Sequence, residues 1–385
     1  MSLVSKSLTA LLRVTSSGKL ALAIVLVLMI FSFAGTVLPQ IDRVNPDDIL
    51  LWQRDHALIT PVAKQIGLFH VFTSWPFMIT LIVLGINTLT CTALRFVRDG
   101  GFACLAGPKR IEKGGFFLLH ISLVMLIVGG FITTALKLNG HIILTEGQTF
   151  SETHAGYLRI AEGPLRKKSH KNFALKLNEI TTEYQKAFYQ TDVTSRLDVL
   201  EQGQKVKEAT VKVNRPFTYK SFAFTHKEIG FSPRIEIRDK NTGRILFYSF
   251  VMLKTYDGDN GKEYRDFLPL DFLKNRTIVT VYPDHVMKDG QAVKTSEEPK
   301  NPLIRIVVED QDGKIVSKEY LTPGQEVPIG DHVFKFADLR RWASFQVVDD
   351  PGYLTVCISL WLGLGALLLR YVPDMRKWSA NADKF

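Results

Sequence analysis

Four long apolar runs divide the chain, at residues 20–38, 75–96, 116–136 and 353–371. A helix of about 20 apolar residues spans the ~30 Å hydrocarbon core of a bilayer, and each run has about this length. The pattern therefore predicts four transmembrane helices, three near the N-terminus and one near the C-terminus.

The segment between the last two runs follows another pattern. Its apolar and polar residues alternate, as is typical of half-buried strands, most clearly at 174–178, 210–214 and 234–238. Turn-forming residues at Asn241–Gly243 and Asp310–Gly313 separate pairs of such stretches and predict two β-hairpins. We expect one or two antiparallel sheets of the sandwich or barrel type.

Charge sets the expected orientation, because short loops rich in Lys and Arg face the cytoplasm. Residues 1–19 hold three basic residues and no acid. The 95–113 link holds five basic residues against two acids, whereas the loop 40–74 holds three against four. We therefore expect a multi-pass protein of the cytoplasmic (inner) membrane, with both termini and the 95–113 link in the cytoplasm. The long segment before the last span is then periplasmic or otherwise extracytoplasmic.

The predicted fold class is membrane α plus all-β: four transmembrane helices with a large β-rich extracytoplasmic domain. Residues 1–136 form the N-terminal membrane part, 137–352 the β-rich domain, and 353–385 the last span with a cytoplasmic tail. The first apolar run is longer than a signal-peptide core. We interpret it as an uncleaved span, with a signal anchor as the alternative.

Composition narrows the chemistry of this 385-residue chain. Its net charge of +10 lies largely in loops that set the topology, so we expect no nucleic-acid partner. Its three cysteines form no CxxC, so no disulfide framework, zinc site or CxxCH haem attachment site is expected. The sequence also lacks the hydrolase, P-loop, zinc-protease and dinucleotide-binding motifs. No self-sufficient catalytic site is predicted.

His120 is the only ionisable residue in the run 116–136. Such residues are costly inside a membrane and are functional candidates by default. It lies ~6 Å into the run from the expected cytoplasmic end. Neutral imidazole can be an axial haem ligand; a proton relay or a hydrogen bond to a carbonyl or neighbouring helix are the alternatives. No other span holds a histidine, so a haem with two axial histidines would need the second from another chain.

The remaining histidines give weaker signals. His70 and His141 are expected at the outer membrane face, where they could border one site, although interfacial histidines are common. The others show no metal-ligand spacing and are interpreted as surface or sheet residues: His154, His170, His226, His285 and His332. The basic cluster Arg166–Lys171 is interpreted as a solvated loop, with contact to an acidic partner or a lipid headgroup as the alternative.

Several short elements occur in a characteristic order along the whole chain. They are Gly35-Thr36 with Pro39-Gln40, the stretch from Gly67 to Phe77, Asn87 with Cys91, His120 with Gly129-Gly130, Glu146-Gly147-Gln148, the stretch from Val213 to Tyr219, and Asp350-Pro351-Gly352. In this order and spacing they resemble the ResB/Ccs1 family of cytochrome c biogenesis proteins, which belongs to the system II pathway. Lys220 departs from the family pattern, which has a glycine there.

The resemblance implies a membrane subunit of the system II cytochrome c synthase complex. Such a subunit helps to take up and export haem and to present it with apocytochrome c for covalent attachment. The implied partners are a tryptophan-rich membrane protein of the CcsA/ResC type, apocytochrome c and, as a further option, a thiol-reducing thioredoxin-like protein. The implied cofactor is haem b, held transiently at the interface with the partner, with His120 as one axial ligand. This chain lacks the tryptophan-rich motif, so we do not expect it to catalyse attachment alone.

Two other functions stay open. One is a membrane cytochrome b-type redox subunit. The single intramembrane histidine argues against it, because a haem with two axial histidines would need the second from another chain. The other is a structural scaffold that binds no haem.

Overall fold

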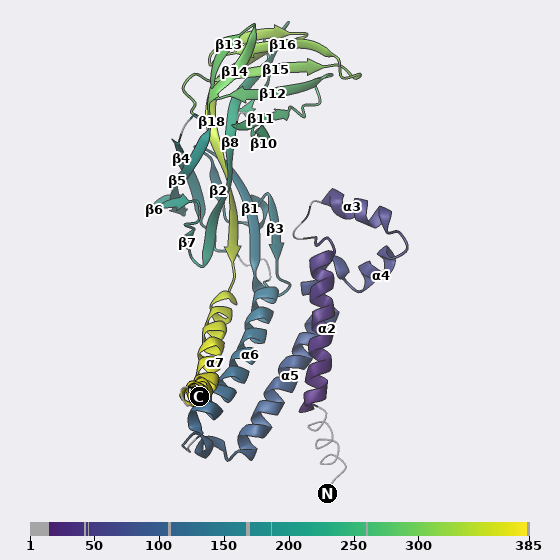
Figure 1. Cartoon of the computed structure of the whole chain (residues 1–385). Helices are drawn as coiled ribbons and strands as arrows, with labels where there is room; N and C mark the ends of the chain where they lie inside the picture. Colours follow the sequence, from purple (N-terminus) through teal and green to yellow (C-terminus); the bar gives the residue numbers. More distant parts are fainter. Residues whose placement is uncertain are drawn as a thin grey trace. The chain divides into compact units, whose positions relative to one another are not determined.

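The computed structural model describes residues 15–41, 44, 46–106, 109–166, 170–185, 187–258 and 261–382. Lys6 and Arg13 of the basic N-terminal flank lie outside this range. The chain divides into two compact units, which we describe separately (Figure 1). The membrane unit comprises Met1–Lys137, Gly163–Leu165 and Asp350–Phe385, and the β-rich unit comprises Leu138–Glu162 and Arg166–Asp349.

Four helices among the described residues are long and apolar enough to cross a membrane. They are α2 (Gly18–Val37), α5 (Trp75–Arg98), α6 (Arg110–Leu136) and α7 (Tyr353–Ala382). Shorter helical elements connect them: α3 (Pro46–Asp55), α4 (Thr60–Gln65) and the 3-10 helices η1 (Leu68–Thr73) and η2 (Gly101–Leu105). The predicted arrangement of three helices before the β-rich region and one after it is confirmed, and the chain is a membrane protein.

Two of these helices extend more than five residues beyond their apolar runs. Helix α6 begins at Arg110, six residues before the predicted Phe116, because the charged residues of its first turns are good helix formers. Helix α7 continues to Ala382, beyond the predicted end at Tyr371. Apolarity therefore located the part of each helix that suits a membrane, and it did not locate the helix ends.

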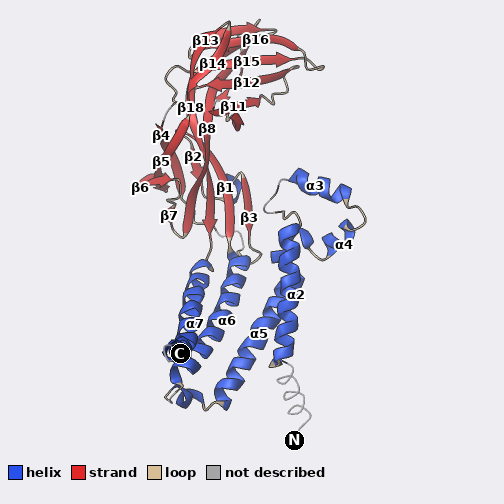
Figure 2. Cartoon of the chain, in the orientation of Figure 1, coloured by secondary structure: helices blue, strands red, loops and turns tan. Residues whose placement is uncertain are grey.

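Helices α6 and α7 lie side by side (Figure 2). They pack closely through small residues. Gly115, Ser122 and Gly129 recur every seven residues on α6 and are buried. A Cβ atom on Gly115 would lie 2.9 Å from the carbonyl oxygen of Ala366, and one on Gly129 would lie 3.0 Å from the backbone nitrogen of Val356. Small residues let membrane helices approach closely, so this contact is made largely by backbone.

The β-rich unit contains four sheets in the described chain, and every ladder between its named strands is antiparallel. The seven-stranded sheet contains β1 (Leu138–Thr145), β3 (Arg159–Glu162), β7 (Phe217–Tyr219), β8 (Phe222–Asp239), β9 (Ile245–Phe250), β17 (Glu326–Ile329) and β18 (His332–Asp349). The four-stranded sheet contains β2 (Thr149–Ser151), β4 (Ala174–Gln185), β5 (Tyr189–Glu201) and β6 (Gln204–Lys212).

The other two sheets are formed by later strands. One has five strands: β10 (Lys254–Gly258), β11 (Gly261–Phe267), β12 (Arg276–Tyr282), β15 (Leu303–Glu309) and β16 (Ile315–Leu321). The other is the hairpin of β13 (Asp284–Lys288) and β14 (Gln291–Ser296). The β-rich character and both predicted hairpins, β8–β9 and β15–β16, are confirmed. The expectation of one or two sheets was wrong.

The paired strands β8 and β18, 18 residues each, join two hydrophobic cores. Phe224 of β8 and Phe345 of β18 belong to the first core, whereas Ile237 and Phe334 of the same strands belong to the second. Strand β18 also pairs with β1, and this ladder places Leu138 opposite Asp349. The chain therefore enters and leaves the β-rich unit on adjacent strands.

Candidate functional site

Several elements of the characteristic order have structural roles. A Cβ atom on Gly35 would lie 2.8 Å from the ring of Phe72, so only glycine lets α2 approach η1 so closely. The buried Gln40 side chain donates a hydrogen bond to the carbonyl of Leu68 (3.0 Å) and accepts one from the backbone N–H of Val71 (3.0 Å). This element therefore fixes η1 against the end of α2.

The element Asp350-Pro351-Gly352, just before the last span, connects α7 to α6. The Asp350 carboxylate accepts hydrogen bonds from the Thr133 hydroxyl (2.8 Å) and from the backbone N–H of Gly352 (3.0 Å). A Cβ atom on Gly352 would collide with the carbonyl oxygen of Gly129. These residues determine helix packing, and none of them is left available for chemistry.

Two elements of the β-rich unit are structural in the same way. The Glu146 carboxylate accepts from the backbone N–H groups of Ile180 (2.7 Å) and Arg341 (3.1 Å), so it ties β4 to β18. Lys220, the departure from the family pattern, lies with Ser221 in the turn between β7 and β8, and the two have φ angles of 46° and 75°. Glycine is favoured at such left-handed positions, which explains why a glycine is expected there.

His120 is different, because part of its imidazole is left available. Its Nδ1 lies 2.8 Å from the carbonyl oxygen of Phe116, one turn back on α6. A carbonyl oxygen can only accept, so Nδ1 carries the proton and Nε2 carries the lone pair. Among the described residues we find no hydrogen bond to Nε2. The side chain is half-buried, and Nε2 is the nitrogen that this tautomer leaves for a metal.

Two arginines lie near the ring of Phe116, which in turn contacts the His120 ring. The Phe116 ring lies 4.0 Å from the His120 ring, centroid to centroid. The guanidinium carbon of Arg95 is 3.9 Å from the Phe116 centroid, and that of Arg370 is 5.7 Å from it. Arg370 also approaches Glu112 at 4.0 Å. In the sequence, Arg95 is only a marker of orientation and Arg370 only a residue of the last span, because nothing there links α5 and α7 to His120.

An apolar groove of about 580 Å³ runs between α5 and α6. Its α6 wall includes Val124, Ile127 and Phe131, which continue the stripe of His120 at helical spacing. Leu89 lies on the α5 wall, and Val124 is one turn of α6 from His120. A flat apolar ligand of a few hundred cubic ångströms is of the size that such a groove takes.

The two other predicted site residues lie apart from this helix. His70 is exposed in η1, within the membrane unit. His141 lies on β1, in the β-rich unit, opposite Gln346 of β18 and Arg159 of β3. Burial, with Arg159 as a second cause, lowers the pKa of His141. They belong to different units, and the idea that they border one site stays a prediction.

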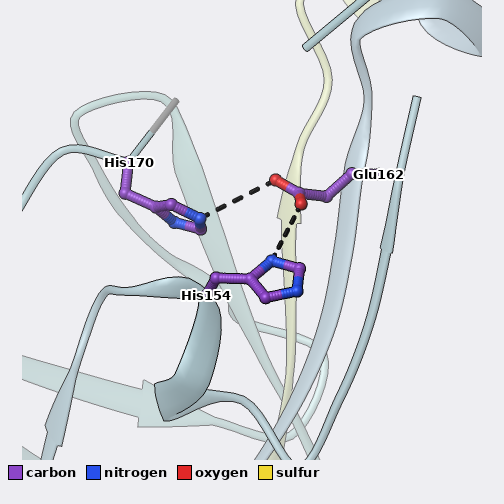
Figure 3. Close-up of side chains that lie close together, drawn as sticks. All are labelled: His154, Glu162 and His170. Atoms are coloured by element: carbon purple, nitrogen blue, oxygen red, sulfur yellow. Dashed lines mark hydrogen bonds and ion pairs between the residues drawn. The ribbon is translucent and has the colours of Figure 1, made fainter. Parts of the chain in front are cut away.

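The structure also brings together three residues that no sequence motif connects. His154, Glu162 and His170 each place one potential ligand atom within 4.8 Å of the others (Figure 3). Their spacing of eight residues matches no common ligand motif, so the sequence showed no signal. The solvated-loop interpretation was wrong for Arg166, which is buried; Lys167, Lys168 and Ser169 lie outside the described residues.

Fold and site together define a multi-span membrane protein with a large β-rich insertion and a single ligand-type histidine in its described spans. The ResB-like family model matches residues 19–102 and 97–383, and the chain belongs to this family. It is 23% identical to the cytochrome c biogenesis protein CcsB of Crocosphaera subtropica, over 100% of this chain and 90% of that protein. It is 19% identical to the cytochrome c biogenesis protein Ccs1 of Heterosigma akashiwo, over 95% of this chain and 90% of that protein.

Proposed function

We propose that this chain is a membrane subunit of a system II cytochrome c synthase complex. In this role it takes up haem on the cytoplasmic side and helps to present it, with apocytochrome c, for covalent attachment outside. Family membership and relatives named for cytochrome c biogenesis support the pathway. The observation that carries the haem role is the state of His120, with Nδ1 bonded to the Phe116 carbonyl and Nε2 available.

Each neighbour of His120 has a task in this proposal. The Phe116 carbonyl fixes the tautomer and the ring orientation, as outer hydrogen bonds do for metal-binding histidines. Arg95 and Arg370 provide positive charge for the propionate carboxylates, and the apolar groove provides a wall for the macrocycle. Haem, when bound, supplies an iron atom for axial ligation and the vinyl groups that form thioether bonds with the CxxCH cysteines of apocytochrome c.

The second axial ligand would come from a partner, because the described spans hold one histidine. The tryptophan-rich CcsA/ResC-type membrane protein is that partner in our proposal. The basic 95–113 link and both termini face the cytoplasm, and the β-rich unit faces outward, where apocytochrome c arrives. The chain does not catalyse attachment alone.

A spectroscopic comparison tests the role of His120. The chain is purified together with its tryptophan-rich partner, and haem b is quantified for wild type, His120→Ala and His56→Ala. His56 is a matched control, because its Nδ1 bonds the carbonyl one turn back (Trp52, 2.9 Å) but its side chain is exposed. We expect His120→Ala to bind at least about tenfold less haem than wild type. Added imidazole, an exogenous axial ligand, should restore part of the bound haem. His56→Ala should match wild type.

Other outcomes would contradict the proposal. Unchanged haem in His120→Ala would remove the histidine from the site. Two haems in the chain purified without a partner, reduced reversibly by a quinol, would favour the cytochrome b-type alternative. A wild-type complex without haem would favour the scaffold.

A further inference from the structure

We propose that His154, Glu162 and His170 bind a divalent metal ion of the Zn(II) class in the β-rich unit (Figure 3). His154 lies on the 3-10 helix η3 (His154–Gly156), Glu162 ends β3, and His170 lies in the loop before β4. All three residues belong to the β-rich unit. The proposal is therefore independent of the haem role of His120.

His170 is held in the form that a metal requires. Its Nδ1 lies 2.6 Å from Glu152 Oε1, and its side chain is only 10% exposed. Its Nε2 is buried and has no hydrogen-bond partner. Buried polar atoms without a partner are uncommon in folded proteins, and this one points towards Glu162. A metal ion would satisfy it.

Glu152 gives His170 the support that is typical of metal-binding histidines, a carboxylate on the nitrogen that does not bind the metal. Glu152 is completely buried. It also accepts hydrogen bonds from the backbone N–H groups of Lys171 and Asn172 and from the hydroxyl of Tyr157 (3.2 Å). Burial, with Glu152 as a further cause, raises the pKa of Tyr157, which keeps that hydroxyl a donor.

Glu162 faces the free nitrogen of His170. Its Oε1 is buried without a hydrogen bond and lies 3.8 Å from His170 Nε2. Two ligand atoms of a tetrahedral zinc ion are about 3.4 Å apart, so this pair of atoms is within a few tenths of an ångström of ligand spacing. The other oxygen, Oε2, is 3.0 Å from His154 Nδ1. The His154 side chain is 48% exposed, which gives the ion a route from solvent and leaves a fourth position for water.

The charges of the surrounding groups favour a divalent cation. The Arg166 side chain is buried, donates to Asp349 Oδ2 (2.7 Å) and lies 3.7 Å from Glu162 Oε1. Glu162 and Asp349 thus share one guanidinium, and Glu152 adds a third carboxylate beside His170. Negative charge exceeds positive charge among these four groups, which favours a divalent cation.

The donor set defines the class of metal. Two imidazoles and one carboxylate suit Zn(II) and neighbouring divalent ions, whereas the lack of a thiolate disfavours Cu(I). The bound ion would clip η3 and the loop before β4 to the end of β3.

A metal titration tests the site on the full-length chain, without a polyhistidine tag, in detergent and after chelator treatment. Zn(II) is titrated against a chromophoric competitor, and bound zinc is measured by mass spectrometry. We expect one zinc per wild-type chain. His170→Ala and Glu162→Gln should bind at least about 100-fold more weakly, and Glu152→Gln, which removes only the positioning charge, about 10- to 100-fold more weakly. His332→Gln, a histidine change elsewhere in the unit, should bind like wild type.

A second measurement covers variants that fail to fold. Co(II) added to the wild-type chain should give the visible absorption bands of a site with fewer than six ligands, and one equivalent of Zn(II) should remove them. Wild-type protein without these bands and without stoichiometric zinc would overturn the proposal. Stoichiometric zinc that persists in folded His170→Ala and Glu162→Gln would overturn it as well.

Discussion

His120 in the membrane unit and His170 in the β-rich unit both use Nδ1 for a hydrogen bond within the protein, but the accepting group is of a different kind in each. In both, Nδ1 is engaged and Nε2 has no hydrogen bond among the described residues. For His120 the engaging group is the carbonyl of Phe116, one turn back on the same helix. For His170 it is the buried carboxylate of Glu152, eighteen residues away in the chain.

The difference follows from the solvent around each unit. A membrane helix satisfies its backbone internally and has few polar neighbours, so its own carbonyl is the partner at hand, and further ligands are scarce. A β-rich fold brings side chains together from separate loops, and here it places two carboxylates, Glu152 and Glu162, beside one histidine pair. In our two proposals, the membrane histidine is one ligand of a site that a partner completes, whereas the β-rich unit supplies three ligands from one chain.

The largest expected effect is a reciprocal loss in two variants. His120→Ala should lose haem at least about tenfold and keep its zinc stoichiometry, because the metal site lies in the other unit. His170→Ala should weaken zinc binding about 100-fold or more and keep its haem. Both ligands are measured on the same preparations of the complex. Loss of both ligands from either variant would show that the two histidines do not form independent sites.

A third histidine sharpens the comparison, because among the described residues the buried His226 is bonded to a serine and not to a carboxylate. Its Nε2 lies 3.0 Å from the Ser195 hydroxyl, and burial lowers its pKa to about 4. The unfolded chain, with an ordinary histidine pKa of about 6.5, binds the proton more readily. The contribution of His226 to the free energy of unfolding is therefore fully present above about pH 6.5. It falls by up to about 3 kcal/mol as the pH drops towards 4.

Chemical denaturation of the protein between pH 7 and pH 4 measures this loss. His226→Gln should reduce the pH dependence by about the same amount, whereas His56→Gln, at an exposed position, should leave it unchanged. A pH dependence that is the same in wild type and His226→Gln would rule out His226 as its source.

The next effect concerns the packing that holds Phe116 and Arg370 near His120. Gly115→Ala places a Cβ atom 2.9 Å from backbone atoms of α7, and overpacking of this kind typically costs about 1–3 kcal/mol. Gly114→Ala, where the nearest atom is 4.0 Å away, should be neutral or stabilise by up to about 1 kcal/mol. Unfolding in detergent compares the two variants, and equal stabilities would contradict the close α6–α7 contact.

The smallest effect is expected at Lys220. Glycine there would relieve the left-handed backbone between β7 and β8 but would remove the Lys220 ion pair with Glu201. Exposed ion pairs contribute little, so Lys220→Gly should change stability by less than about 1 kcal/mol, towards the stable side. Thermal unfolding measures it. A clear destabilisation would mean that the ion pair matters more than the backbone.

The sequence predicted what depends on local pattern. Apolar length located the four spans, and turn residues located the β8–β9 and β15–β16 hairpins. The number of sheets could not be predicted, because it depends on pairing between distant strands and on β8 and β18 running through two cores. Bulges in the β8–β18 ladder, such as that between Phe336 and Asp338, also have no reliable sequence signal.

The same limit applies to the sites. His120 stood out because a charge-capable residue is rare in an apolar run. Arg95 and Arg370 did not, because their position near Phe116 depends on three helices meeting. The cluster from Arg166 to Lys171 looked like a solvated charge run, because no acidic residue lies within it. The carboxylates that accompany Arg166 and His170 are those of Glu152, Glu162 and Asp349, and Asp349 is 183 positions from Arg166.

The pairing of Leu138 with Asp349 makes the β-rich unit a removable module. Paired Cα atoms in an antiparallel ladder are about 5 Å apart, and domains whose ends lie this close can be inserted or excised with little disturbance. A short loop could therefore join α6 directly to α7 in place of residues 138–349, of which only Gly163–Leu165 belong to the membrane unit. The excised residues could be produced as a separate protein. Haem chemistry and metal chemistry could then be studied on two different molecules.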